Sequence, residues 1–130
     1  MDQPQFIAYK NRLNLARLSL RLGLSTVFAY AAFEAFTNPA GFLKYIPSFV
    51  VTIVNPDYFL PIFGTAEIIL TLWLLSGIKI RFAAIASFFL MAAIVGFNPE
   101  YFNVLFRNIA IGFAALALAL LEEVNTTFIN

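Results

Sequence analysis

Cysteine and histidine are both missing from this sequence of 130 residues. Without cysteine the chain forms no disulfide of its own and offers no thiolate for catalysis, for a metal ion or for an iron–sulfur cluster. Without histidine it lacks the usual axial ligand of haem, the commonest zinc ligand and the commonest catalytic base. We therefore expect no metal site in this chain and no cofactor bound covalently or through a metal ligand.

Charged residues are also scarce, at 12% of the chain, and they sum to a net charge of +1. So small a charge provides no basic surface for nucleic acid. Hydrophobic residues make up 62% of the sequence, and its mean hydropathy is +0.86. A soluble domain of this length could not bury so much apolar surface, because small domains leave much of their surface exposed. The composition predicts a lipid bilayer as the main partner, and the length predicts one domain, residues 1–130.

Runs of about 20 apolar residues predict helices long enough to cross a bilayer. Four such helices are expected, at residues 18–36, 56–77, 81–97 and 99–121. Asn55-Pro56 precedes the second helix and Asn98-Pro99 the fourth, and these residue types are typical of an N-cap and a first helical position. The sequence therefore predicts an all-α fold, a four-helix transmembrane bundle.

The connection between the first two helices, residues 37–55, is long and largely apolar. Its stretch over residues 41–54 is too short to cross the bilayer, and Pro47 interrupts it. We expect an interfacial or re-entrant segment there.

Basic residues are unevenly divided between the two ends of the predicted helices. Lys44 and Arg107 lie toward one end, and the other six lie toward the opposite end: Lys10, Arg12, Arg17, Arg21, Lys79 and Arg81. Because cytoplasmic loops are enriched in Lys and Arg, we expect both termini in the cytoplasm. Lys10, Arg17 and Arg21 share one helix face, and we expect them to contact anionic lipid headgroups, with docking of a soluble partner as the alternative.

Ionisable side chains within the predicted helices mark the candidate site. Glu67 lies about 16 Å into the second helix, and Arg107 about 12 Å into the fourth from the same side of the membrane. Such groups are costly in hydrocarbon, so they usually face the interior of a bundle and pair. We predict a buried polar cavity in the outer half, for a small polar or quinone-like ligand or for protons. Its expected lining is Tyr30, Glu34, Glu67, Thr71, Arg107 and Asn108.

A simpler interpretation of the same residues is a buried Glu67–Arg107 ion pair that only fixes the register of the helices. The sequence alone does not decide between this pair and a working cavity.

Several motifs resemble those of the DoxX-like family of small four-helix membrane proteins. They are Arg21-Leu22-Gly23, Phe36-Thr37-Asn38-Pro39, Tyr45-Ile46-Pro47, Gly64-Thr65-Ala66-Glu67, Leu75-Ser76-Gly77-Ile78-Lys79-Ile80-Arg81 and Arg107-Asn108-Ile109-Ala110. The resemblance implies that Glu67 and Arg107 correspond to a Glu and an Arg that recur in the family. Asn108 stands where family members commonly have an Asp, which weakens the case for a proton relay at that position. The first helix of family members often ends with a Gly and a Lys, and Glu34 falls near that place in this sequence.

Members of that family look like membrane subunits of quinone-linked oxidoreductases, including thiosulfate–quinone and terminal quinol oxidase assemblies. The resemblance implies a respiratory subunit in a bacterial or archaeal cell (inner) membrane, non-catalytic or in contact with quinone, rather than an enzyme acting alone. Its partners would be other subunits of the complex, or copies of itself. Glu67 would be the candidate proton acceptor, and Arg107 its charge partner. A small proton-coupled transporter and a purely structural assembly subunit remain the alternatives.

Overall fold

The computed structural model describes residues 2–43 and 46–128, and of residues 102–104 and 123–128 it describes the backbone alone. Every element in this part of the chain is helical, which confirms the all-α prediction. In chain order the elements are α1 (Gln3–Thr37), α2 (Ala40–Leu43), α3 (Ser48–Ile53), α4 (Pro56–Ser76), α5 (Ile80–Gly96), the 3₁₀ turn η1 (Pro99–Tyr101) and α6 (Phe102–Phe128).

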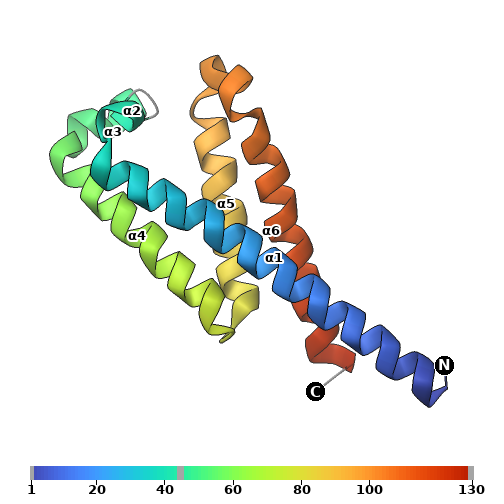
Figure 1. Cartoon of the computed structure of the whole chain (residues 1–130). Helices are drawn as coiled ribbons and strands as arrows, with labels where there is room; N and C mark the ends of the chain where they lie inside the picture. The colour runs from blue at the N-terminus through green and yellow to red at the C-terminus, as the bar shows by residue number, and fades with distance from the viewer. Residues whose placement is uncertain (1, 44–45, 129–130) are drawn as a thin grey trace.

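The four long helices form two antiparallel pairs (Figure 1). α1 packs most extensively along α4, and α5 along α6, while contacts of α1 with α6 and of α4 with α5 join the pairs. The pairs diverge toward the end that carries α2, α3 and η1, which we call the outer end. α1 starts and α6 finishes at the opposite, inner end (Figure 1).

α4 begins and ends as its sequence predicts. The Asn55 side chain accepts a hydrogen bond from the Asp57 backbone N–H at 3.0 Å, as expected of an N-cap. The helix stops at Gly77, whose φ of +80° is the left-handed conformation typical of a residue after a helix. α5 likewise lies within one residue of its predicted bounds at both ends.

The ends of α1 and α6 differ from prediction. α1 starts at Gln3, where Asp2 and Gln5 form a capping box, so a polar stretch extends the helix well before residue 18. Asn98 does not cap α6, because its side-chain N–H₂ donates to the Ile94 carbonyl at 2.8 Å and so satisfies the end of α5. α6 therefore follows η1, and its last helical residue is Phe128.

The hydrophobic core lies nearer the inner end and joins all four long helices. It comprises Leu24 and Phe28 of α1, Leu70 and Leu74 of α4, Ile80, Ala83, Ala84 and Met91 of α5, and Ala115, Leu118 and Ala119 of α6. α4 and the stretch Leu105–Glu122 of α6 are long and apolar enough to cross a membrane, and α5 is slightly shorter. Only 28% and 33% of those two stretches is buried within the chain.

Candidate functional site

Glu67 is the most deeply buried acidic side chain among those described, at 2% exposure. It lies on one face of α4 with four other buried residues spaced three or four apart, Leu60, Gly64, Thr71 and Leu74. Its Oε2 atom is buried and has no hydrogen-bond partner in the described part of the chain. A buried carboxyl group in such surroundings requires a proton, a cation or a polar ligand.

Two contacts define the surroundings of Glu67. The Thr71 hydroxyl donates to the Glu67 backbone carbonyl at 2.8 Å, so it lies one turn toward the inner end. One turn toward the outer end, a Cβ atom on Gly64 would lie 2.7 Å from the Phe36 ring, so glycine permits the close approach of α1 and α4 there. A groove of about 380 Å³ opens between α1 and α4 and reaches Thr71. The groove is lined by Ile68 and Thr71, which lie one and four residues after Glu67 on α4.

Two of the other predicted cavity residues, Tyr30 and Arg107, are exposed. Tyr30 is 65% exposed, because α1 turns the face of Leu24, Phe28 and Ala32 inward and Tyr30 outward. Glu34 and Asn108 are half-buried. Tyr30 thus lies on a different face of α1 from the one that packs, and it does not line an enclosed cavity in the described chain.

Arg107 is also exposed, and the Glu67–Arg107 ion pair is not formed between these two described residues. α6 packs through Gly112 and Ala115, and Arg107 falls on another face. It lies five residues, about 7.5 Å, after Phe102, the first residue of α6. A long basic side chain so close to a helix end can extend to the membrane surface.

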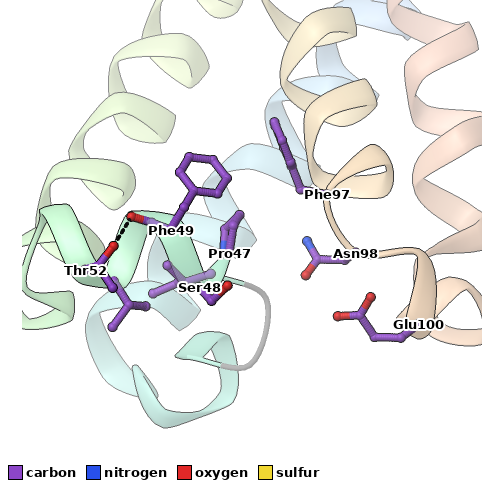
Figure 2. Close-up of a pocket in the computed structure, with 9 residues that line it drawn as sticks. Pro47, Ser48, Phe49, Thr52, Phe97, Asn98 and Glu100 are labelled. Carbon is purple, nitrogen blue, oxygen red and sulfur yellow. Dashed lines mark hydrogen bonds between the residues drawn. The ribbon is translucent and has the colours of Figure 1, made fainter.

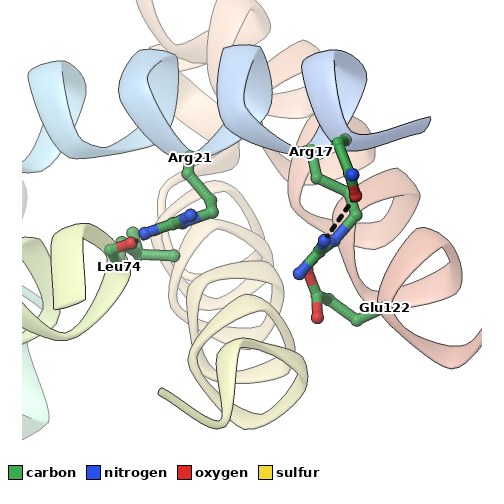
Figure 3. A network of polar contacts seen from close by, with 5 residues as sticks. Arg17, Arg21, Leu74 and Glu122 are labelled. Carbon is green, nitrogen blue, oxygen red and sulfur yellow. Dashed lines mark hydrogen bonds and ion pairs between the residues drawn. The ribbon is translucent and has the colours of Figure 1, made fainter. Parts of the chain in front are cut away.

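Two basic residues at the inner end, Arg17 and Arg21, form contacts within the chain (Figure 3). Arg17 forms an ion pair with Glu122 of α6. Arg21 donates from Nε to the Leu74 carbonyl and from Nη2 to the Leu75 carbonyl, both at 2.9 Å, and so caps the C-terminus of α4. These two arginines tie α1 to both neighbours. Lys10 lies nearer the N-terminus of α1 and is half-buried.

A pocket of about 720 Å³ lies at the outer end, between α3 and the turn from α5 to α6 (Figure 2). The rings of Phe49 and Phe97, which both line it, are in tilted contact, with centroids 5.6 Å apart. Asn98 and Glu100 supply its polar wall. Sequence reasoning missed this pocket because segments some 50 positions apart form it.

Ser25 is a second residue that sequence reasoning missed. It is 4% exposed, and its hydroxyl, like Glu67 Oε2, has no partner in the described part of the chain. Its position four residues after Arg21 was the available signal, since it shares that residue's helix face. The described residues contain no group of three or more acidic side chains that could hold a metal ion.

In the part of the chain that the structure describes, these features define a small all-helical protein with two helices long and apolar enough to span a membrane, one of which carries a buried glutamate. The chain belongs to the DoxX family, a family of membrane proteins, because the DoxX family model matches residues 16–99. The match includes Arg21 and Glu67 and stops before α6, so Arg107 and Asn108 lie outside it. No curated protein and no solved structure matches the chain.

Proposed function

We propose that this chain is a four-helix, multi-pass protein of a bacterial or archaeal cell membrane with both termini in the cytoplasm. Its exposed apolar surface supports this, because a core helix of a soluble protein would be mostly buried and α4 and α6 are not. Large apolar side chains such as Leu72, Phe89 and Phe113 are exposed along α4, α5 and α6. The excess of basic residues at the inner end supports the orientation.

Within that membrane, the proposed function is that of a subunit of a quinone-linked oxidoreductase complex, with Glu67 as the group that exchanges protons with bound quinone. The observation that carries the proposal is the buried, unpartnered Glu67 carboxyl oxygen on a helix long enough to span the bilayer. The groove between α1 and α4 supports it, since its apolar walls suit a quinone that arrives from the lipid. Haem and iron–sulfur centres would belong to partner subunits.

The test is quinone turnover by the complex purified with its partner subunits. Glu67→Gln keeps the size of the side chain and removes its acid–base chemistry. We expect turnover to fall at least tenfold while the subunits still co-purify, in line with the loss of a positioned proton-transfer group. Arg107→Gln is the matched control, because Arg107 is exposed and does not pair with Glu67. Unchanged turnover in the Glu67 variant would exclude the acid–base role.

One structural observation favours a second candidate, a small proton-coupled transporter. A nearby Arg107, as the sequence predicts, argues against a transporter. A carboxylate paired with an arginine is held ionised, so it cannot alternate between its protonated and ionised forms. In the structure Arg107 does not pair with Glu67. Uptake of a solute by proteoliposomes that contain this chain alone, driven by a proton gradient, would favour the transporter over the complex subunit.

A purely structural role, the third alternative, was predicted to depend on the Glu67–Arg107 pair as a clamp. That contact is not formed in the structure. The polar contacts that join the helices at the inner end include the Arg17–Glu122 ion pair and the hydrogen bonds of Arg21. These contacts can hold the bundle together and leave Glu67 without a clamping role.

A further inference from the structure

The pocket at the outer end, between α3 and the turn from α5 to α6, takes no part in the proposed function. None of its described lining residues belongs to α4, the helix that carries Glu67. Its volume of about 720 Å³ is in the range typical of small-molecule sites, and both polar and apolar side chains line it. The pocket is therefore a candidate binding site that is independent of Glu67.

Asn98 supplies a buried hydrogen-bond acceptor to this pocket. Its side chain is 3% exposed, and its N–H₂ group donates to the Ile94 carbonyl at 2.8 Å. Because only the amide nitrogen can donate to a carbonyl, this bond fixes the orientation of the amide and leaves Oδ1 as its free end. Oδ1 accepts no hydrogen bond within the described part of the chain. Figure 2 shows the amide directed from the turn toward α3, so the buried acceptor favours a ligand that carries a donor.

Glu100 gives the same wall of the pocket a negative charge. It is the single charged residue among the described lining residues, and its carboxylate also extends toward α3 (Figure 2). The Thr52 hydroxyl donates its only proton to the Phe49 carbonyl at 2.7 Å, so toward a ligand it can only accept. A carboxylate beside such acceptors attracts a cation with N–H donors, because charge-assisted hydrogen bonds are the stronger ones, and it repels an anion.

Two aromatic rings complete the pocket. Phe49 and Phe97 are in contact with each other, and each is more than half exposed, so part of each ring surface is free. The face of an aromatic ring attracts a cation that lies within about 6 Å of its centre, and the same face is apolar enough to cover a carbon chain. Aromatic residues at a membrane surface often contact lipid headgroups alone, but these two lie beside a carboxylate and a buried acceptor.

We propose that this pocket binds a primary ammonium ion. Its N–H groups donate to Asn98 Oδ1 and to the Glu100 carboxylate, and the carbon chain next to the nitrogen packs on the rings of Phe49 and Phe97. Two sources offer this chemistry at the outer end, namely a free alkylamine from the aqueous phase and the ethanolamine headgroup of a lipid. The proposal goes beyond the quinone-linked role and does not depend on it.

The test is binding of n-hexylammonium to the purified full-length chain in phosphatidylcholine nanodiscs, measured by calorimetry with empty nanodiscs as the blank. Hexan-1-ol lacks the charge, and hexyltrimethylammonium keeps the charge but has no N–H donor. We expect saturable binding of hexylammonium, about tenfold tighter than that of hexanol and severalfold tighter than that of the quaternary ion. In nanodiscs of phosphatidylethanolamine, loss of this binding identifies the headgroup as the ligand, and unchanged binding identifies the free amine.

Three variants separate the pocket from general effects of charge and lipid. Glu100→Gln should weaken hexylammonium binding about tenfold, and Phe49→Leu about two- to fivefold. Asp57→Asn is the matched control, because Asp57 is an exposed acidic residue that also follows Asn-Pro at the outer end and does not line the pocket.

The proposal fails if hexylammonium shows no saturable binding, if hexanol binds as tightly, or if the Glu100 and Asp57 variants bind alike. Glu67→Gln should bind hexylammonium as the wild type does, so such a failure would leave the proposed function intact.

Discussion

Substitution of Gly77 by alanine should destabilise the inner end of the bundle in two separable ways. Gly77 has φ +80° and ψ 3°, a left-handed conformation that costs a residue with a Cβ about 1–2 kcal/mol. The new Cβ would also stand 3.1 Å from Nη2 of Arg21. That guanidinium group is held by 2.9 Å hydrogen bonds to the carbonyls of Leu74 and Leu75.

The two contributions differ in how they respond to a second substitution. A hydrogen bond from a charged group contributes about 1.5–3 kcal/mol, and partial exposure of Arg21 places these bonds at the lower end. We expect Gly77→Ala to reduce the free energy of unfolding by about 2–4 kcal/mol in the wild type. In an Arg21→Met background it should cost only the backbone strain, about 1–2 kcal/mol, because no guanidinium remains to be displaced.

The assay is unfolding in mixed micelles titrated with denaturing detergent, followed by Trp73 fluorescence. The Trp73 indole N–H donates to the Ile78 carbonyl at 2.8 Å, across the turn that contains Gly77. Gly23→Ala is the control of opposite sign, since no atom lies within 4 Å of its new Cβ, and alanine stabilises a helix interior by about 0.5–1 kcal/mol. Strict additivity of Gly77→Ala and Arg21→Met would refute the proposed contact.

Three further substitutions can be measured in the same titration. Asn55→Ala should cost about 1 kcal/mol, because the Asp57 N–H loses its cap, and a cost near zero would mean that water replaces the side chain. Arg17→Met should cost about 2–3 kcal/mol, more than a surface ion pair, because Arg17 and Glu122 are mostly shielded from solvent, and a change below about 0.5 kcal/mol would contradict this. Arg107→Gln should change stability by no more than about 0.5 kcal/mol, whereas a loss of several kcal/mol would show that Arg107 has a buried partner.

The bounds of α4 were predictable because local residues determine them. Asn55 and Pro56 begin this helix, Gly77 ends it, and each acts within two residues of its own position. Asn98 shows the limit of such local patterns. It precedes a proline and an acidic residue as Asn55 does, but its side chain serves the helix before it. A capping motif between two helices does not by itself say which of them it satisfies.

The inward face of α1 was not predictable from polarity. In water, apolar residues mark the buried side of a helix, but in lipid both sides are apolar and small residues mark the packed side instead. Ala32 and Ala35 lie on that side, with Ser25, whereas Tyr30 lies on the other. The polar residues of α1 that were predicted to line the cavity, Tyr30 and Glu34, were therefore a poor guide to its packed side.

Arg17 and Arg21 have two functions that the sequence does not distinguish. Both count toward the basic excess that orients a membrane protein, and both bond to groups of the bundle, Glu122 in one case and the carbonyls that end α4 in the other. A guanidinium group bonded in this way is less free to bind lipid headgroups, because part of its set of five donors is already used and its position is fixed.

The exposed basic residues at the inner end, Arg12, Lys79 and Arg81, are then the better candidates for headgroup contacts. Removal of their charges should weaken association with anionic lipid and leave the free energy of unfolding nearly unchanged, whereas removal of Arg17 or Arg21 should do the reverse. The two measurements together separate orientation of the chain in the membrane from cohesion of its helices. A loss of lipid binding on removal of Arg21 alone, at unchanged stability, would contradict this division.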